Sequence, residues 1–196
     1  MLIGITGQIG SGKTEVARLF RKHRAFVISA DKIGHDVVDN DPKVLGKLVA
    51  AFGQGIINSR GRLNRKQLAQ IAFSSTRGKA KLDSIVHPPL LKELSRQVRN
   101  AQIRNKLVVV DAALLIEWGW HKKVDYLLVV LAPNRAKIAR LMNKGYSQRE
   151  AHSRLKSQLS ARRYRQVADR VIYNNKSLAA LEVQVKEIIS ALTKKG

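Results

Sequence analysis

Hydrophobic and polar positions follow two different patterns along this chain of 196 residues. Short, continuous apolar runs predict buried parallel strands, because a strand that is covered on both faces shows no alternation with polar residues. The longer segments between them repeat apolar residues every three or four positions, which is typical of one face of an α-helix. Strands that alternate with helices predict an α/β three-layer sandwich with a five-stranded parallel sheet. The predicted strands are Leu2–Thr6, Ala25–Ser29, Leu107–Asp111, Tyr126–Leu131 and Arg170–Tyr173.

Residues with capping preferences mark the ends of several predicted helices. Asp41-Pro42 and Asn64-Arg65 look like helix starts, and Asn134 is a plausible N-cap. Ser147 and Glu150 have the spacing of a capping box, which we expect to open a helix that runs towards Arg163. The other predicted helices are Thr14–His23, Pro42–Phe52, Arg65–Phe73, two around His87-Pro88-Pro89, Asn134–Lys144, and a last one from about Ser177 with Leu178, Leu181, Val185, Ile188 and Leu192 on one stripe.

One interval interrupts the alternation of strands and helices. About 75 residues separate the second predicted strand from the third, although a simple crossover needs only about a dozen. The interval is mostly helical in pattern, and it is expected at the edge of the sheet where open α/β folds bind ligands. The predicted organisation is a core of residues 1–31, 107–134 and 164–196, a helical insertion over 32–106, and a separate basic segment over 135–163.

The segment Gly7–Thr14 matches the phosphate-loop pattern G-x-x-x-x-G-K-[ST], between a predicted strand and a predicted helix. Glycines allow backbone N–H groups to curl around phosphate oxygens, and the start of the helix adds a favourable dipole. Lys13 supplies positive charge to the β- and γ-phosphates, and the Thr14 hydroxyl is a ligand for Mg²⁺. The sequence therefore predicts a nucleotide site made of Gly7, Ile9, Gly10, Ser11, Gly12, Lys13, Thr14 and Glu15.

Sequence motifs outside the phosphate loop indicate which class of phosphate-loop protein this chain belongs to. A GTPase should carry N-K-x-D to read guanine, but Asn175-Lys176-Ser177 is followed by Leu178. What remains is a compact kinase that closes over a small acceptor. Asp31 follows the second predicted strand and is either the base that accepts a proton from an attacking hydroxyl or an N-cap. Asp111 ends the third strand and is either a carboxylate ligand of Mg²⁺ or the cap of the next turn.

Positive charge is concentrated in the segment from Arg135 to Arg170. It holds eleven Lys and Arg residues, and only Glu150 and Asp169 are acidic. Arginines on a closing segment stabilise the charge that spreads over a transferring phosphoryl group. The alternative is a solvated basic helical hairpin. The candidate arginines are Arg140, Arg154, Arg162 and Arg163.

Composition and charge limit the remaining classes of protein. The absence of cysteine excludes a disulfide scaffold, a thiolate zinc site and a cysteine nucleophile. The apolar runs are too short to cross a membrane, and no basic leader precedes the first of them, so we expect a cytoplasmic protein. A net charge of +23 favours contact with polyanions. Aromatic residues make up only 5% of the chain, so specific nucleic-acid binding is not expected.

Several motifs, taken in order along the chain, together resemble the dephospho-coenzyme A kinase family. They are Gly7–Thr14, Asp31 within Ser29-Ala30-Asp31-Lys32-Ile33, Arg65, His87-Pro88, Leu114-Leu115-Ile116-Glu117, and Ala168-Asp169-Arg170-Val171-Ile172-Tyr173-Asn174-Asn175. The resemblance implies transfer of the γ-phosphate of ATP, with Mg²⁺, to the ribose 3′-hydroxyl of dephospho-CoA. It also implies a nucleotide-binding core, a helical acceptor-binding domain and a lid, which agree with the three segments above.

The same resemblance assigns roles to individual residues. Asp31 becomes the base for the 3′-hydroxyl, and Arg140 becomes the lid arginine on the transferring phosphoryl group. Asn174 or Asn175 is expected near the adenine of ATP. From its position alone, His87 is more typical of a helix start or a core than of catalysis, but the resemblance places it near the acceptor. The residues implied at the acceptor are Asp31, Arg65, His87, Leu115 and Glu117.

Three positions depart from the pattern of that family. Ser29 stands where the family often has the first aspartate of Asp-Ala-Asp, so Asp31 is the remaining carboxylate there. Ala113 stands where a proline usually precedes Leu-Leu, and Lys176 stands where glycine often follows Asn-Asn. A nucleoside or nucleoside-monophosphate kinase is the alternative enzyme. A basic nucleic-acid-binding protein with a regulatory phosphate loop is the alternative from another class.

Overall fold

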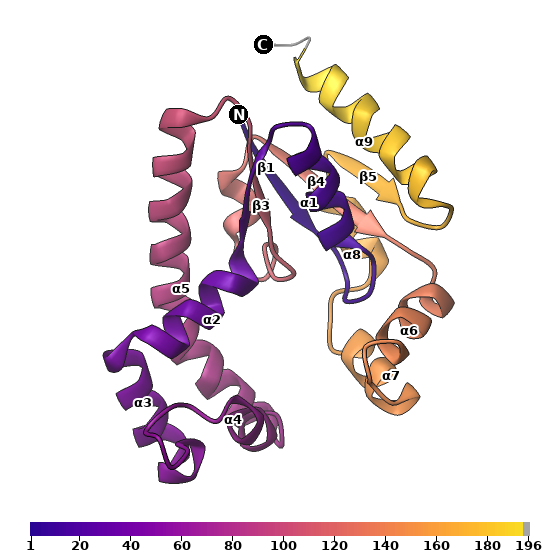
Figure 1. The fold of residues 1–196 in the computed structure, drawn as a ribbon. Coiled ribbons are helices and arrows are strands. Elements are labelled where there is room, and N and C mark those ends of the chain that lie inside the picture. Colours follow the sequence, from indigo (N-terminus) through magenta and orange to yellow (C-terminus); the bar gives the residue numbers. More distant parts are fainter. Residues whose placement is uncertain (194–196) are drawn as a thin grey trace. The chain divides into compact units, whose positions relative to one another are not determined.

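The computed structural model describes residues 1–193 and contains a parallel β-sheet of five strands (Figure 1). The strands lie in the order β2-β3-β1-β4-β5. The pairs β1 with β3, β1 with β4, and β4 with β5 are all parallel. The strands are β1 (Leu2–Thr6), β2 (Phe26–Ser29), β3 (Val108–Asp111), β4 (Tyr126–Leu131) and β5 (Arg170–Tyr173).

The five predicted strands are confirmed, two of them starting one residue later than expected. Burial on both faces holds for the central strands but not for the two edge strands. Phe26 of β2 is 46% exposed and Tyr173 of β5 is 47% exposed. An edge strand has a neighbour on only one side, so a continuous apolar run does not by itself guarantee burial.

The chain divides into two compact units, and the sheet belongs to the first, which consists of Met1–Ile28 and the residues from Asn100 onward. Its helices cover both faces of the sheet. Leu128 and Val130 of β4 pack with α1 (Lys13–Lys22) and α9 (Leu178–Thr193). Val129 and Leu131 face the other way and pack with Tyr164 of α8 (Ala161–Val167). This alternation confirms the three-layer sandwich.

Two helix predictions in the basic segment are wrong in detail. The helix α6 (Asn134–Met142) has Pro133 as its N-cap, so Asn134 is already helical and makes no capping bond. The predicted capping box of Ser147 and Glu150 is present and opens α7 (Gln148–Lys156). That helix ends well before Arg163 because the Ser160 hydroxyl, which accepts from the Arg163 amide, caps α8 as a separate helix.

The last helix also differs from its predicted stripe. Leu181, Val185 and Ile188 of α9 are buried and Leu192 packs against the same core, as expected. Leu178 is 50% exposed at the first position of the helix, and the residues of α9 that pack in the core begin with Leu181.

The second unit, Ser29–Arg99, is helical and has its own core. Leu48, Ile56 and Ala72 are fully buried within it. The Asp41 carboxylate caps α3 and the Asn64 side chain caps α4, as predicted. The bounds of this unit differ slightly from those of the helical insertion, which was expected at residues 32–106. The basic segment 135–163, which was predicted as a separate part, falls in the same unit as the sheet. The elements of the second unit are α2 (Ala30–Asn40), α3 (Pro42–Phe52), the short 3-10 turn Gln54–Ile56, α4 (Arg65–Ala72) and α5 (Thr76–Arg104), which runs on into the first unit.

One long helix replaces the two that were predicted around the Pro-Pro pair. Pro88 and Pro89 lie inside α5, where each removes one backbone donor. The helix continues because apolar residues on both sides of the prolines are packed: Leu82 and Ile85 lie against the core before them, and Leu94 is buried after them. Within residues 1–193, no helix has both the length and the apolar character needed to cross a lipid bilayer.

Candidate functional site

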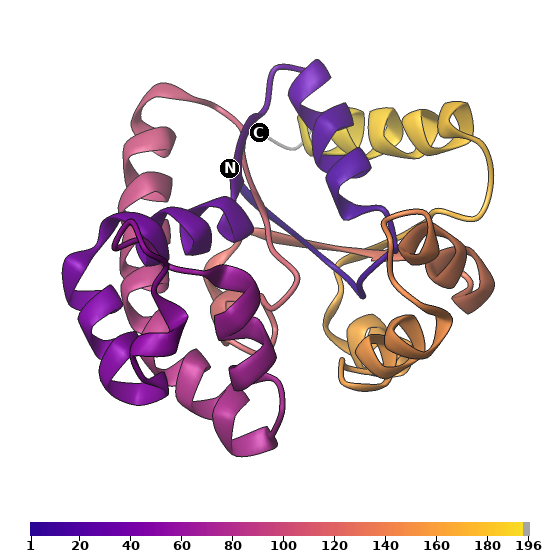
Figure 2. The same cartoon turned by 60° about the horizontal axis from the view of Figure 1, so that its bottom comes forward.

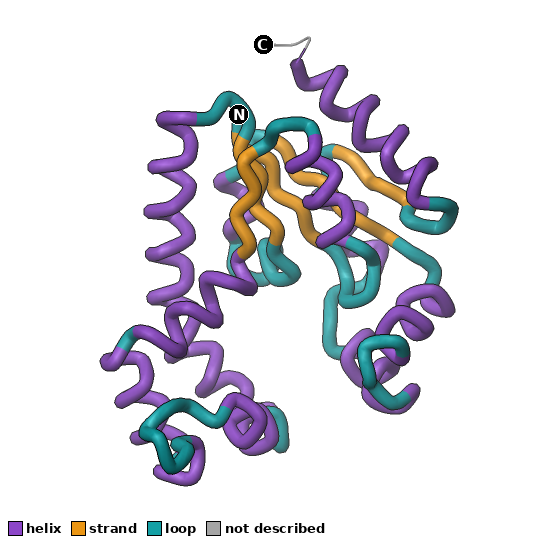
Figure 3. Tube along the Cα trace, in the orientation of Figure 1, coloured by secondary structure: helices purple, strands orange, loops and turns teal. Residues whose placement is uncertain are grey.

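The segment Gly7–Thr14 forms the loop that joins β1 to α1 and the first two residues of that helix (Figure 3). Three of its glycines, Gly7, Gly10 and Gly12, have positive φ angles. Gly12 is the N-cap of α1, with a φ of +98° in the left-handed region. A Cβ at this position would collide with the side-chain amide of Asn174. Glycine is therefore required at position 12 by both its φ and its close neighbour.

The charged and hydroxyl groups of the motif lie at the start of α1. Lys13 is the first residue of the helix, and its Nζ donates to the carbonyls of Gly7 at 2.9 Å and Gln8 at 3.3 Å. Thr14 follows it and is exposed, while the Ser11 hydroxyl is buried without a hydrogen-bond partner among the described residues. The first N–H groups of a helix lack intrahelical acceptors, so this end of α1 favours an anion. The carboxylate of Glu15, the residue after Thr14, forms an ion pair with Arg18 at 2.6 Å.

The Arg140 side chain of α6 holds the loop through hydrogen bonds to its backbone. Its Nη1 donates to the carbonyls of Gly10 at 3.0 Å and Ser11 at 3.2 Å, and its Nη2 donates to the carbonyl of Asn174 at 3.3 Å. Asn174, directly after β5, is buried and donates from Nδ2 to the Ser11 carbonyl at 2.9 Å. Figures 1 and 2 show α6 beside the β1–α1 connection. Arg140 and Asn174, both predicted from the sequence, therefore contact the phosphate loop. The neighbouring Asn175 is exposed.

We expect Asn174→Ala to lower the melting temperature by roughly 3–6 °C. The change removes one buried hydrogen bond to the loop, worth about 1–2 kcal/mol, and that energy corresponds to this shift in a protein of this size. Asn175→Ala is the matched control, because Asn175 is the exposed neighbour of the same type, and it should change the melting temperature by less than about 1 °C. Differential scanning calorimetry measures both. Equal shifts in the two variants would contradict the bracing role of Asn174.

Two contacts that sequence reasoning missed connect the loop to the segment between α7 and α8. The Ile9 amide donates to Gln158 Oε1 at 2.7 Å, and Gln8 Nε2 donates to the Leu159 carbonyl at 2.9 Å. Nothing in the pattern around Gln158 indicated this contact. Lys137, also missed, is buried next to the loop; it lies four residues before the buried Leu141, on the face of α6 that the helix buries, and this spacing was the available signal.

Two oxygen-bearing residues of this unit suit a hard divalent cation. Asp111 ends β3 directly opposite Ile5 of β1, the strand that leads into the loop, and the exposed Thr14 is the second residue of α1. Carboxylate and hydroxyl oxygens, together with phosphate oxygens, are the ligands that Mg²⁺ prefers. The described residues contain no group of three His, Asp or Glu side chains that could hold a metal by itself. The donor set therefore fits an ion that is shared with the phosphates of a nucleotide.

Two of the residues predicted to bind the acceptor, Leu115 and Glu117, lie in the turn that follows β3. Leu115 is buried and Glu117 is exposed. The Thr6 hydroxyl donates to the Ala113 carbonyl at 3.2 Å, which links this turn to the end of β1.

Asp31 belongs to the second unit, as the exposed second residue of α2. Its alternative interpretation as an N-cap is wrong. Ser29 caps α2 instead, because its hydroxyl accepts from the Lys32 amide at 3.3 Å. Serine and aspartate both cap helices well, so Ser29 supplies the cap and Asp31 is not needed for it.

Arg65 and His87 occupy two different helices of the second unit. The Arg65 guanidinium contacts both carboxylate oxygens of Asp39 and so links α4 to α2. His87 lies in the middle of α5, not at a helix start, and its Nε2 is 3.4 Å from Asp83 Oδ1. Burial lowers the pKa of the His87 imidazole, and the Asp83 carboxylate opposes that change.

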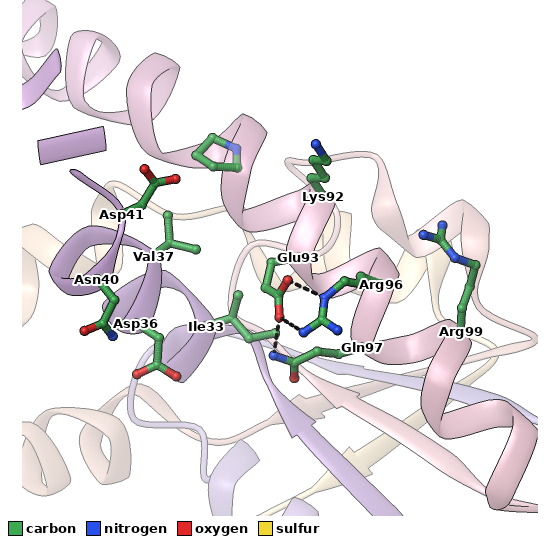
Figure 4. A pocket seen from close by; sticks show the side chains of 11 residues that line it. Ile33, Asp36, Val37, Asn40, Asp41, Lys92, Glu93, Arg96, Gln97 and Arg99 are labelled. Atoms are coloured by element: carbon green, nitrogen blue, oxygen red, sulfur yellow. Dashed lines mark hydrogen bonds and ion pairs between the residues drawn. The ribbon is translucent and has the colours of Figure 1, made fainter. Parts of the chain in front are cut away.

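A pocket of about 450 Å³ lies between α2 and α5 within the second unit (Figure 4). Ile33, Asp36 and Val37 line it from α2, about 140–240° around the helix from Asp31 at 100° per residue. It therefore lies on a different face of α2 from Asp31. On its α5 side, hydrogen bonds from Arg96 and Gln97 lower the pKa of the Glu93 carboxyl to about 2.

Comparisons with known proteins agree with one another. The family model described as dephospho-CoA kinase matches residues 1–180. A dephospho-CoA kinase from Aquifex aeolicus is 36% identical over 192 residues, which cover 98% of this chain and 97% of the relative. The crystal structure of TT1252 from Thermus thermophilus has a TM-score of 0.82 at 31% identity and covers 98% of this chain and 97% of its own. A dephospho-CoA kinase structure from Campylobacter jejuni has a TM-score of 0.76 at 25% identity, covering 99% and 98%.

Proposed function

This chain belongs to the dephospho-CoA kinase family, and on that premise we propose that it transfers the γ-phosphate of ATP to the ribose 3′-hydroxyl of dephospho-CoA. The product is coenzyme A, so the enzyme acts in the last step of its synthesis. The observation that carries the proposal is the phosphate loop Gly7–Thr14, with Lys13 at the first position of α1 and bracing contacts to the loop from Arg140 and Asn174.

The phosphate side of the reaction is assigned to the first unit. The N–H groups of the loop and of the start of α1 bind the phosphate oxygens, as in other phosphate loops. Lys13 neutralises charge that grows on the β–γ bridging oxygen, and Arg140 does the same for the transferring group. The backbone carbonyls that Lys13 and Arg140 contact hold both cations at the loop. We assign the basic segment 135–163, which carries Arg140, as the lid.

Mg²⁺ is the cofactor that this chemistry requires, and Thr14 and Asp111 are the residues that would hold it with the phosphates. When bound, the ion neutralises part of the phosphate charge.

The acceptor side is assigned to the second unit and to the turn after β3. Asp31 comes two residues after β2, and ligands of open α/β sheets bind at the carboxyl ends of strands. The 3′-oxygen forms a bond to the γ-phosphorus, the bond from that phosphorus to the β–γ bridging oxygen breaks, and ADP leaves. The hydroxyl proton goes to the Asp31 carboxylate. Arg65, His87, Leu115 and Glu117 are assigned to acceptor binding.

For the adenine of ATP, the two asparagines after β5 are not equivalent. The Asn174 side chain donates to the Ser11 carbonyl, so its role is to hold the loop. Asn175 is exposed, and we assign contact with the base to it. We place the enzyme in the cytoplasm.

The test is an acceptor panel with ATP, Mg²⁺ and the purified chain. We expect stoichiometric ADP and coenzyme A with dephospho-CoA, and little turnover with nucleosides or nucleoside monophosphates. A preference for a nucleoside monophosphate would replace the proposal with the alternative kinase. Sequence-dependent binding to DNA or RNA that survives 200 mM salt, without any kinase activity, would instead favour the nucleic-acid-binding alternative.

A further inference from the structure

Lys137 of α6 is a buried lysine at the phosphate loop. Only 3% of the surface of this residue is exposed to solvent. Its Nζ donates to Gln8 Oε1, the one acceptor it has among the described residues. None of the described carboxylates forms an ion pair with it. The chain therefore buries a positive charge next to its phosphate site without a negative partner.

Such an arrangement is unfavourable for the protein alone. An ammonium group has three donors, and taking it out of water without a counter-charge disfavours its charged form. Burial accordingly lowers the pKa of the Lys137 ammonium. If Lys137 only filled space, an apolar residue would make the free protein more stable. Replacing buried charges by well-packed apolar residues is often neutral or stabilising.

The packing keeps Lys137 at the loop. A Cβ added to Gly10, where φ is +76°, would lie 2.8 Å from the Lys137 carbonyl oxygen and 3.1 Å from its Cα. The backbone of α6 is therefore in close contact with the loop. On the other side, Gln8 Nε2 donates to the Leu159 carbonyl at 2.9 Å, which leaves Gln8 Oε1 to accept from Lys137.

The other charges at the loop increase the positive potential there. Lys13 and Arg140 both point at loop carbonyls, and the acidic Glu15 is paired with Arg18. Three cations thus converge on one loop. A triphosphate is the anion that would bring the charge needed to balance them.

We propose that Lys137 is a positioning residue of the phosphate site, whose buried charge, held against Gln8, increases the affinity of the loop for the triphosphate of ATP at the expense of the stability of the free protein. The inference rests on the proposed function of Gly7–Thr14 as the ATP site.

The test compares Lys137→Gln, which removes the charge but keeps a donor for Gln8, with Lys137→Met, which removes both. Both variants should raise the KM for ATP about tenfold, the effect of losing about 1.4 kcal/mol of binding, while kcat changes by less than about threefold. The melting temperature of the free protein should rise by roughly 2–4 °C, and the further rise on adding MgATP should shrink. Lys106→Gln removes the same formal charge from an exposed position just before β3, outside the loop and outside the segment 135–163, and should change none of these values.

Three results would overturn the proposal. A lower melting temperature of both variants, with the wild-type KM for ATP, would mean that Lys137 only supports packing. A raised KM in Lys137→Met alone would mean that the hydrogen bond matters and the charge does not. Equal effects in Lys106→Gln would mean that the loss of any lysine acts through the net charge of the protein. Failure of the proposed function is recognised separately, because the wild-type protein would then not convert dephospho-CoA in the same assay.

Discussion

Lys13→Ala is expected to lower kcat by about 10²–10³-fold, the loss that follows removal of one preorganised group that stabilises charge in a transition state. The reason is that charge grows on the leaving oxygen during transfer, and Lys13 at the start of α1 is held at the loop by the carbonyls of Gly7 and Gln8. The KM for ATP should also rise, but less than kcat falls, because the interaction strengthens in the transition state. Steady-state kinetics with dephospho-CoA as the acceptor measures both constants.

Lys22→Ala provides the matched control for this experiment. Lys22 is the last residue of the same helix, and its ion pair with Glu182 is at the surface, where such pairs contribute at most about 1 kcal/mol. Its removal should leave kcat and KM within about twofold of wild type. A fall in kcat of less than tenfold for Lys13→Ala, with the fold intact by circular dichroism, would show that Lys13 does not act on the transferring charge.

The sequence could predict those parts of the molecule whose determinants are local. The strands of the sheet are continuous apolar runs, and the loop Gly7–Thr14 has its own residue pattern, because its backbone geometry requires glycine at Gly12. Caps are local as well, and the Asp41, Asn64 and Ser147 caps were predicted, whereas the prediction of Asn134 as a cap was wrong. Side chains that act within three or four residues of their own position leave a readable signal.

What could not be predicted depends on residues that are distant along the chain. Gln8 and Leu159 are 151 positions apart, and Lys137 is 129 positions from Gln8. No local pattern encodes such pairs. The same holds for the uninterrupted α5, where tertiary packing of Leu82 and Leu94 outweighs the local effect of two prolines. The exposed face of an edge strand such as β2 also depends on the order of strands in the sheet, which apolar runs do not reveal.

Asp31→Asn is expected to lower kcat by about 10²–10⁴-fold, the contribution of a positioned general base. Asparagine has nearly the same shape but does not accept the proton of the 3′-hydroxyl. The KM for ATP should remain within about threefold, since Asp31 is assigned to the acceptor. The fold should tolerate the change, because Ser29 rather than Asp31 caps α2; the loss of one carboxylate from the first helical turn costs only about 0.3–1 kcal/mol.

The control for Asp31→Asn is Asp36→Asn, five residues further along the same helix. Asp36 is also exposed, but it lines the pocket on another face of α2, so its change should leave kcat within about twofold. The two variants change the net charge equally and make the same replacement on the same helix, so a difference between them beyond the small first-turn effect of Asp31 isolates the position of the carboxylate. Turnover of Asp31→Asn near the wild-type rate would remove Asp31 from the role of base, and an equal loss in Asp36→Asn would attribute the effect to α2 as a whole. Because Ser29 already supplies the cap, a selective loss at Asp31 would have no structural explanation and would leave proton transfer as its cause.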